Sequence, residues 1–450
     1  MSSTPPPPAE TKSGPPPSVT SYGINMVGAV AALVALAVLH QQHWLASGDA
    51  VLIVCAAGIL PIIALDLLVL RVHRRASTNL DWDREAAPDA ARCLTKLLGL
   101  VATLAPIALA YFVFPEYGDW YGAFWSSLRR FWAPLVAGSV VYVWFVDGRM
   151  RDPHDAYWQL GRWVLGHRED ARREDLANHA RGWLVKAFFI PLFIVFLHNQ
   201  IGGILTYDLR DLRGTNLRLY HFSSDLIYAL DVLYAALGYC LGMRIFDSHL
   251  RTAEPTMFGW VVALECYQPF WGRLSSSMYL HYEGIGFEAW LGPHPTLRWA
   301  WAIAILVLEG IYVFATFAFG IRFSNLTHRG ILTNGPYRFS KHPAYIAKNM
   351  SWWLITLPFI PHHGWVEALK STLALAGVST IYFLRARTEE RHLSHDPTYV
   401  AYAKWINEHG LLRFLNRIPF FRYRAPAERA TSAPVAAAPL PAHVEPVAAD

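Results

Sequence analysis

The sequence predicts an all-α protein that crosses a membrane about ten times and ends in a helix lying on the membrane surface. Of its 450 residues, 54% are hydrophobic and only 16% are charged, whereas a soluble protein carries about 25% charged residues. The hydrophobic residues form repeated long runs, and the loops between these runs hold most of the Lys and Arg. The 18 Trp and 21 Tyr suit the two membrane–water interfaces, where amphipathic rings gather.

Charge and cysteine content narrow the possible functions. The net charge of +5 needs no nucleic-acid partner, because anionic lipid at a cytoplasmic surface accounts for it. The four cysteines are far apart and form no Cys-x-x-Cys or Cys/His pattern, so we expect neither a disulfide framework nor a metal site.

Composition divides the chain into four predicted regions. Residues 1–20 form a disordered Pro-rich tail without the charged start and apolar core of a secretory leader, and residues 425–450 form a disordered Pro/Ala-rich tail. Between the tails we expect an N-terminal transmembrane region of unknown role at 21–296 and a membrane core at 297–424.

Ten apolar runs are the candidate spans. They cover Ile24–Val38, Val51–Val72, Leu97–Phe114, Phe131–Phe145, Ala187–Ile204, Leu226–Phe246, Met257–Phe270, Trp299–Ile321, Met350–Ile360 and Val366–Leu384. After them, residues 394–424 mix aromatic, aliphatic and basic side chains, which is typical of an interfacial helix.

Basic residues give the expected orientation. The cluster Arg71–Arg75 follows the second run and should stay in the cytoplasm, which places both termini there by alternation. Three arginines in the loop 205–225, on the supposed outer side, run against this rule. The run Met257–Phe270 is shorter than the roughly 20 residues that a straight span needs. We count it as a span because the later runs then end on the same side as Arg71–Arg75.

Several acids lie within the apolar runs, where ionisable side chains are functional candidates. Asp66 is close enough to Arg71 to reach toward the interface. Asp231 and Glu309 are deeper and are candidates to line a substrate cavity, and Glu265 lies in the short seventh run.

Two polar clusters flank the last apolar hairpin. Gly335-Pro336-Tyr337 and His342-Pro343-x-Tyr345 precede it, and Arg385-x-Arg387-Thr388-Glu389-Glu390 follows it. A hairpin returns its two ends to the same membrane face, so we expect His342 and Glu389 to share one pocket. The simpler alternative is that the basic residues are membrane anchors paired with the carboxylates, but several ordered motifs favour a site.

These motifs resemble a known enzyme family. GPYRFSKHPAYIAKN, then RTEERHL, then Tyr399-x-x-Tyr402 is similar to the isoprenylcysteine carboxyl methyltransferase and phospholipid methyltransferase group. These are integral membrane enzymes that use S-adenosylmethionine. The resemblance covers about Gly320–Trp405, and it departs from the family at Lys341 (usually Arg), Ala347 (usually Gly) and His395-Asp396 (usually Phe-Gly).

The resemblance implies a methyl transfer from S-adenosylmethionine to a lipid-borne acceptor, either an isoprenylcysteine-like carboxylate or a lipid amine. A lipophilic or prenylated substrate would enter from the bilayer, and the cofactor from the cytoplasm. The family's cofactor contacts fall on Arg329, Gly330, Ile331, Leu332, Tyr337, His342, Pro343, Ala344, Tyr345 and Glu389. Arg385 falls on the substrate-contacting arginine, and Glu390 or His392 would be the base if the acceptor were an amine.

Two other functions stay open from the sequence. Sterol reductases also have about ten spans and bind NADPH, but here Pro343 follows the histidine, and Glu389-Glu390 stands where the reductases carry an Asp-Glu pair followed by Cys. A transporter or a catalytically silent scaffold is the third candidate, although the spans show no paired broken helices of the inverted-repeat kind.

Overall fold

The computed structural model describes residues 14–42, 48–83, 87–114, 116–213, 217–276, 279–418 and 421–425. Within these residues the protein is nearly all-α, as the sequence predicts, with one two-stranded sheet. Residues 1–13 and 426–450, which hold most of the two predicted tails, lie outside the described residues.

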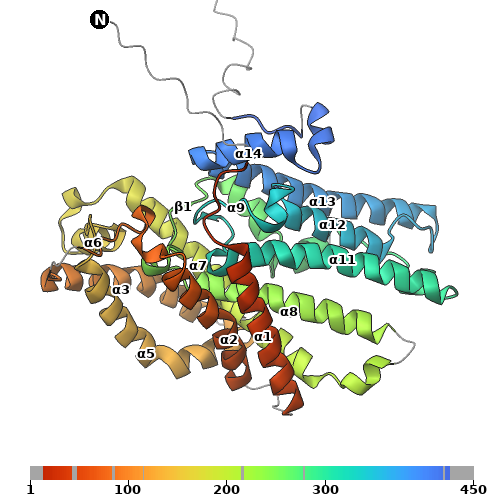
Figure 1. Cartoon of the computed structure of the whole chain (residues 1–450), viewed down its shortest axis with the longest axis horizontal. Coiled ribbons are helices and arrows are strands. Elements are labelled where there is room, and N and C mark those ends of the chain that lie inside the picture. The colour runs from red at the N-terminus through yellow and green to blue at the C-terminus, as the bar shows by residue number, and fades with distance from the viewer. Residues whose placement is uncertain are drawn as a thin grey trace, which may run out of the picture.

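The helices form in the order that the apolar runs predict (Figure 1). In the first half they are α1 (Tyr22–Gln41), α2 (Gly48–Leu68), α3 (Ala90–Val113), α4 (Glu116–Trp120), α5 (Gly122–Asp147), α6 (Ala156–Val164), α7 (Arg173–Thr206) and α8 (Arg218–Cys240). In the second half they are α9 (Met257–Leu264), α10 (Phe287–Trp290), α11 (Pro295–Phe319), α12 (Pro343–Thr356), α13 (Trp365–Leu393) and α14 (Pro397–His409).

Five segments of the described chain are long and apolar enough to cross a membrane, namely α1, α2, α3, α7 and residues 295–322 around α11. The expected total of about ten spans is therefore not confirmed. The segment Met257–Phe270 contributes only α9, which has 8 residues. At about 1.5 Å per residue, such a helix does not cross a hydrocarbon layer of about 30 Å by itself.

Exposed apolar side chains indicate which helix surfaces face lipid. On α1, Val27, Val30, Val34 and Val38 are each 46–57% exposed. Their spacing of three or four residues puts them in one stripe along the helix. Such a stripe is unfavourable in water and suits a bilayer, so these exposed faces agree with a multi-pass membrane protein.

The largest core joins the N-terminal helices to the C-terminal region. Every residue from Ala229 to Tyr239 of α8 is buried, and α8 packs against α7 on one side and α11 on another. The same core includes side chains of α1 and α2, which approach each other closely where Gly28 faces the backbone of Gly58. The predicted regions 21–296 and 297–424 therefore share one continuous core across α8 and α11.

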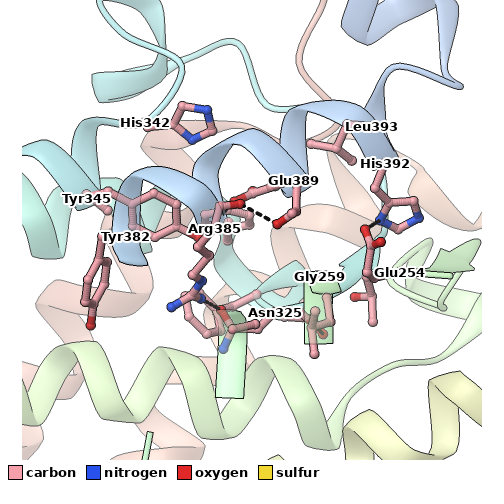
Figure 2. A pocket seen from close by; sticks show the side chains of 18 of the residues that line it. Glu254, Gly259, Asn325, His342, Tyr345, Tyr382, Arg385, Glu389, His392 and Leu393 are labelled. Carbon is pink, nitrogen blue, oxygen red and sulfur yellow. Dashed lines mark hydrogen bonds and ion pairs between the residues drawn. The ribbon is translucent and has the colours of Figure 1, made fainter. Parts of the chain in front are cut away.

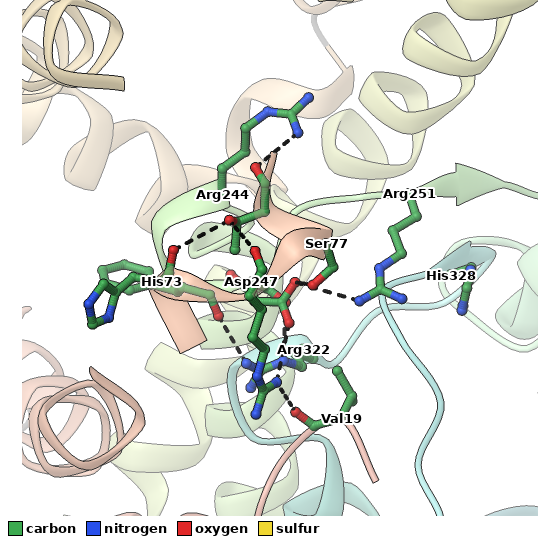
Figure 3. Close-up of polar contacts among 12 residues, drawn as sticks. Val19, His73, Ser77, Arg244, Asp247, Arg251, Arg322 and His328 are labelled. Carbon is green, nitrogen blue, oxygen red and sulfur yellow. Dashed lines mark hydrogen bonds and ion pairs between the residues drawn. The ribbon is translucent and has the colours of Figure 1, made fainter. Parts of the chain in front are cut away.

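Buried ion pairs link the same two regions (Figure 3). Asp66 of α2 lies 3.1 Å from the Arg322 guanidinium, and both side chains are essentially unexposed. From its sequence position we had expected Asp66 to reach toward the interface near Arg71. Instead, Asp66 pairs with Arg322 across the core. A hydrogen bond adds a second link, because Arg322 Nε donates to the Asp247 backbone carbonyl at 3.2 Å. The Asp247 carboxylate itself pairs within the first region, 3.2 Å from Arg75 and 3.5 Å from Arg251.

A short strand pair and residues 16–20 pack against the C-terminal core. Strands β1 (Thr252–Ala253) and β2 (Thr327–His328) pair in antiparallel fashion, which brings Glu254 beside the segment after α11. Residues 16–20, within the predicted N-terminal tail, lie along residues 331–334. The Val19 N–H donates to the Ile331 carbonyl at 2.9 Å, and Asn334 donates to the Thr20 carbonyl at 2.6 Å.

Candidate active site

The first half of the site is the start of α12. Pro343 occupies the first helical turn, where its missing N–H costs no hydrogen bond, and His342 is the residue before the helix. The helix therefore begins at the cluster that the sequence predicts. The imidazole of His342 stacks on the Tyr345 ring, with centroids 5.6 Å apart and planes inclined by 7°.

The second half of the site is the end of α13. Arg385 and Glu389 are four residues apart and share a helix face. The Tyr345 hydroxyl donates to Glu389 Oε2 at 2.8 Å, so the two ends of the hairpin meet. His342 and Glu389 line the same pocket, as we predicted from the hairpin (Figure 2).

The pocket lies among α9, α11, α12 and α13 and holds about 970 Å³ of empty space, part of it open to solvent. Of the predicted site residues, Tyr337, His342, Ala344, Tyr345, Arg385 and Glu389 line it. The other predicted residues, Arg329, Gly330, Ile331, Leu332, Pro343 and Glu390, are not among its lining residues.

Arg385 enters the pocket without a carboxylate partner among the described residues. Its Nη2 donates to Asn325 Oδ1 at 2.5 Å and lies 3.3 Å from the Tyr267 hydroxyl. The guanidinium lies 4.9 Å from the Tyr345 ring centroid and 6.0 Å from that of Tyr382. Aromatic faces and an amide thus hold this cation in place, and the remaining donors are available to an anionic ligand.

A second cation, Lys348, lies on α12 about one helical turn after Tyr345. The Lys348 ammonium lies 5.0 Å from the Tyr312 ring centroid and 5.3 Å from that of Trp352. Asp231 approaches this end of the pocket, where its carboxylate accepts hydrogen bonds from Tyr312 at 2.5 Å and Thr316 at 2.6 Å. Neither Asp231 nor Glu309 lines the pocket itself, so the expected role of these acids in a substrate cavity stays a prediction.

Glu254 and His392 line another part of the pocket. His392 Nε2 lies 2.9 Å from the Thr252 hydroxyl, and its Nδ1 lies 3.9 Å from the Glu254 carboxylate. Burial lowers the pKa of His392, while the negative charge of Glu254 acts in the opposite direction. Arg391 also donates to Glu254, at 3.2 Å, which fixes the carboxylate in position.

Glu390 points to a different set of partners. It lies 2.5 Å from Lys341, 2.8 Å from Arg387 and 3.3 Å from His342, and is 3% exposed. Burial acts to raise the pKa of Glu390, but hydrogen bonds and charge from His342 and Lys341 hold it at about 2. A carboxylate with such a pKa is a weak base, so this geometry favours a positioning role for Glu390 over the base that we had considered.

The segment 329–332 contacts α8, residue Val19 and α14, none of which belongs to the pocket lining. Arg329 is 3% exposed and its Nη1 donates to the Gly238 carbonyl at 2.6 Å, away from the pocket. Gly330 has a φ of +110°, a conformation that suits glycine, and a side chain there would collide with Val19. Ile331 and Leu332 are both buried, and Ile331 packs with the tyrosines of α14.

The departures from the family motifs have local explanations. Lys341 supplies the ion pair to Glu390. Ala347 is a buried residue of α12. Asp396 caps α14 by accepting from the Thr398 N–H at 2.8 Å, and the Tyr402 hydroxyl of α14 donates to the Tyr337 carbonyl at 2.7 Å. The turn Gly335-Pro336-Tyr337 is thus held by α14.

The order and geometry of these residues agree with one comparison. Residues 299–395 match the model of the isoprenylcysteine carboxyl methyltransferase (ICMT) family. We call this segment the ICMT region. The match confirms the resemblance seen in the motifs and supports a membrane methyltransferase. Neither a curated protein nor a solved structure matches the chain.

Sequence reasoning missed one wall of the pocket. Glu254, Gly259, Ala263 and Tyr267 line it and precede the ICMT region. The Arg385–Tyr267 contact joins residues 118 positions apart. No local motif marks these positions. The sequence offered one indication, the acidic residue Glu254 directly before Pro255.

Proposed function

We propose that the protein is an S-adenosylmethionine-dependent methyltransferase that acts on a lipid-borne carboxylate. The observation that carries this proposal is the pocket in which His342, Tyr345, Arg385 and Glu389 meet. The match of the ICMT region supports the reaction class, and the charges within the pocket support the choice of acceptor.

The pocket residues fit the cofactor's chemistry. S-adenosylmethionine supplies a methyl group on a positively charged sulfur, together with an amino-acid head and a ribose. Glu389 is the carboxylate that would bind the amino or ribose groups, and Tyr337 and Tyr345 offer aromatic faces to a cation. His342 and the free N–H groups at the start of α12 would bind the cofactor's carboxylate.

The acceptor follows from the unpaired cation in the pocket. Arg385 has no carboxylate partner among the described residues, so its guanidinium is free to orient a carboxylate through charge-assisted hydrogen bonds. An ammonium acceptor would be repelled by Arg385 and by Lys348, both of which line the pocket. A carboxylate also needs no proton removal before it attacks, and positioning then supplies most of the catalysis.

The substrate and the cofactor would reach the pocket from different sides. Met257 and Phe258, at the start of α9, are 79% and 50% exposed, so an apolar surface borders the pocket wall. We infer that the lipid tail of the substrate reaches the pocket from the bilayer and that the cofactor enters from the cytoplasm. The basic loops of the sequence favour this orientation.

Binding and turnover of the purified full-length protein test the proposal. We expect Glu389→Ala and His342→Ala to lose S-adenosylmethionine binding in calorimetry while still inserting into membranes. The matched controls are Glu408→Ala and His409→Ala, which change exposed residues of α14. Normal methylation by the two site variants would overturn the site assignment.

Product analysis separates the alternative reactions. Tritium from methyl-labelled S-adenosylmethionine should appear in a farnesylated cysteine with a free carboxylate, and not in a farnesylated amine. Oxidation of NADPH without methyl transfer would instead support the reductase. Labelled-methionine feeding, followed by lipid extraction from cells with and without the protein, identifies the natural acceptor.

A further inference from the structure

A buried arginine outside the pocket lacks partners for most of its donors. Arg329 is 3% exposed, and its Nη1 donates to the Gly238 carbonyl near the end of α8. Its Nε and Nη2 have no hydrogen-bond partner among the described residues. A buried charged donor without an acceptor is strongly unfavourable, so an anion at this place would be favoured.

A lysine from α7 faces the same spot. Arg329 Nη2 and Lys186 Nζ lie 3.5 Å and 3.6 Å from the point where a side chain on Gly242 would begin. The Lys186 ammonium lies over the Trp183 ring at 4.6 Å from its centroid, and no ion pair with a carboxylate is found for it among the described residues. Two cations therefore flank one spot that Gly242 leaves open.

The surroundings do not neutralise this pair. Burial lowers the pKa of Arg329 to about 10, so the guanidinium still carries its charge at neutral pH. The neighbouring His249 is neutral there, because burial and nearby arginines lower its pKa to about 3. The nearest acid of this segment, Asp247, is already paired with Arg75 and Arg251. The local charge is thus positive, and the part of the chain that the structure describes supplies no counterion for it.

The spot lies beside the C-terminal end of α8 and the point within α7 where its apolar run begins. Lys186 directly precedes the apolar run 187–204 of α7, and Cys240, the last residue of α8, is exposed. Lys186 itself is partly exposed beside them. These positions correspond to the headgroup depth of a bilayer, where phosphate groups are abundant and attract basic side chains.

We propose that Lys186 and Arg329, with Gly242 between them, bind the phosphate of an anionic lipid headgroup. The site is separate from the pocket of the ICMT region and does not depend on the methyl-transfer reaction. The lipid would supply the missing acceptors for Arg329, and its bound headgroup would hold the end of α8 against α7 at Lys186.

Thermal stability measured against lipid content tests this site. The full-length protein is placed in phosphatidylcholine nanodiscs, and phosphatidylglycerol is added in steps. We expect Tm to rise with saturation for the unaltered protein. The phosphatidylglycerol content at half-saturation should rise at least tenfold in Lys186→Gln, while Lys186→Arg should retain the response. Gly242→Ala should also weaken the response, because its methyl group occupies the spot without strain or change of charge.

Two controls make the result decisive. Arg413→Gln removes an exposed charge outside the site and should leave the half-saturation content unchanged. Equal responses of the unaltered protein, Lys186→Gln and Gly242→Ala would overturn the site. An equal rise in Tm with inorganic phosphate at the same concentration would overturn the lipid as its ligand.

Discussion

At the scale of single residues, the two neighbouring carboxylates of α13 have different tasks. Glu389 lines the pocket and accepts from Tyr345, whereas Glu390 is enclosed by Lys341, His342 and Arg387. The difference follows from helix geometry, since consecutive residues point about 100° apart. Glu389 is therefore the acid that we propose binds a ligand, whereas Glu390 pairs with residues at both ends of the hairpin.

Arg385→Ala should retain cofactor binding and lose turnover by about 100-fold or more, because the acceptor loses its charged anchor. The measurement pairs calorimetry with S-adenosylmethionine and initial rates of methyl transfer. Lys370→Ala, which removes an exposed cation of the same helix outside the pocket, is the matched control and should keep most of its activity. Loss of cofactor affinity in Arg385→Ala would instead make Arg385 a cofactor ligand.

The pairing of Glu390 predicts a dependence of stability on pH. Its pKa of about 2 in the folded protein is below the ordinary value of 4.5, so its stabilisation is complete above about pH 4.5 and is lost as the pH falls toward 2. The shift corresponds to roughly 3 kcal/mol. We expect Glu390→Gln to have a lower Tm than the unaltered protein at pH 6 and a difference about half as large or less at pH 3, where part of the stabilisation remains.

The control for this titration is Glu367→Gln. Glu367 forms an exposed pair with Lys370 at 2.7 Å, and an exposed pair contributes little to stability. Its substitution should give a small difference in Tm that does not change between pH 6 and pH 3. A constant difference for Glu390→Gln as well would show that the contact, and not the charge, is what Glu390 contributes.

At the scale of elements, close helix contacts depend on small residues. Helices α3 and α6 cross where Gly99 meets the backbone of Tyr157 and Gly161 meets that of Thr95. A methyl group at either glycine would overlap a carbonyl oxygen. The sequence alone did not reveal this crossing, because neither glycine belongs to a recognisable pattern.

Gly99→Ala should therefore separate the two helices and destabilise the protein by about 1–3 kcal/mol. The measurement is Tm in detergent, with unfolding monitored by intrinsic fluorescence. Gly138→Ala in α5 is the matched control, since nothing lies near its added methyl group. Alanine there should leave stability unchanged or raise it by about 0.5–1 kcal/mol. Equal effects of the two substitutions would argue against the α3–α6 contact.

The elements also show what a sequence can and cannot reveal. His342, Tyr345 and Glu389 were predicted to meet because an apolar hairpin fixes where its ends return. The contribution of Tyr267 was not predictable, because a contact over 118 positions depends on how α9 packs against α13. The hydrogen-bond partner of Arg329 was also not predictable from the sequence. Its motif position pointed to the cofactor, but the end of α8 offers it a carbonyl acceptor.

At the scale of the whole molecule, the N-terminal helices and the ICMT region behave as one structure. Their common core and the Asp66–Arg322 ion pair connect α2 to the segment that leads into the pocket. Asn325, which contacts Arg385, follows Arg322 by three residues. The expected boundary near residue 297 separates a recognisable sequence from an unrecognised one, but the helices pack across it.

Asp66→Ala should leave the Arg322 charge buried without its partner and cost about 3–5 kcal/mol of stability. Because Arg322 directly precedes the pocket segment, S-adenosylmethionine affinity should fall together with Tm. Asp49→Ala is the matched control, because its pair with Arg130 is about half exposed on both sides. A normal Tm for Asp66→Ala would show that Arg322 is stabilised by its backbone acceptors alone.

The wall formed by Glu254, Gly259 and Tyr267 has a consequence for how such a chain can change over generations. A recombination event that exchanged only the recognisable C-terminal stretch between two related genes would join half of one binding cavity to half of another. If the pocket is the active site, we expect substitutions on its two sides to be inherited together.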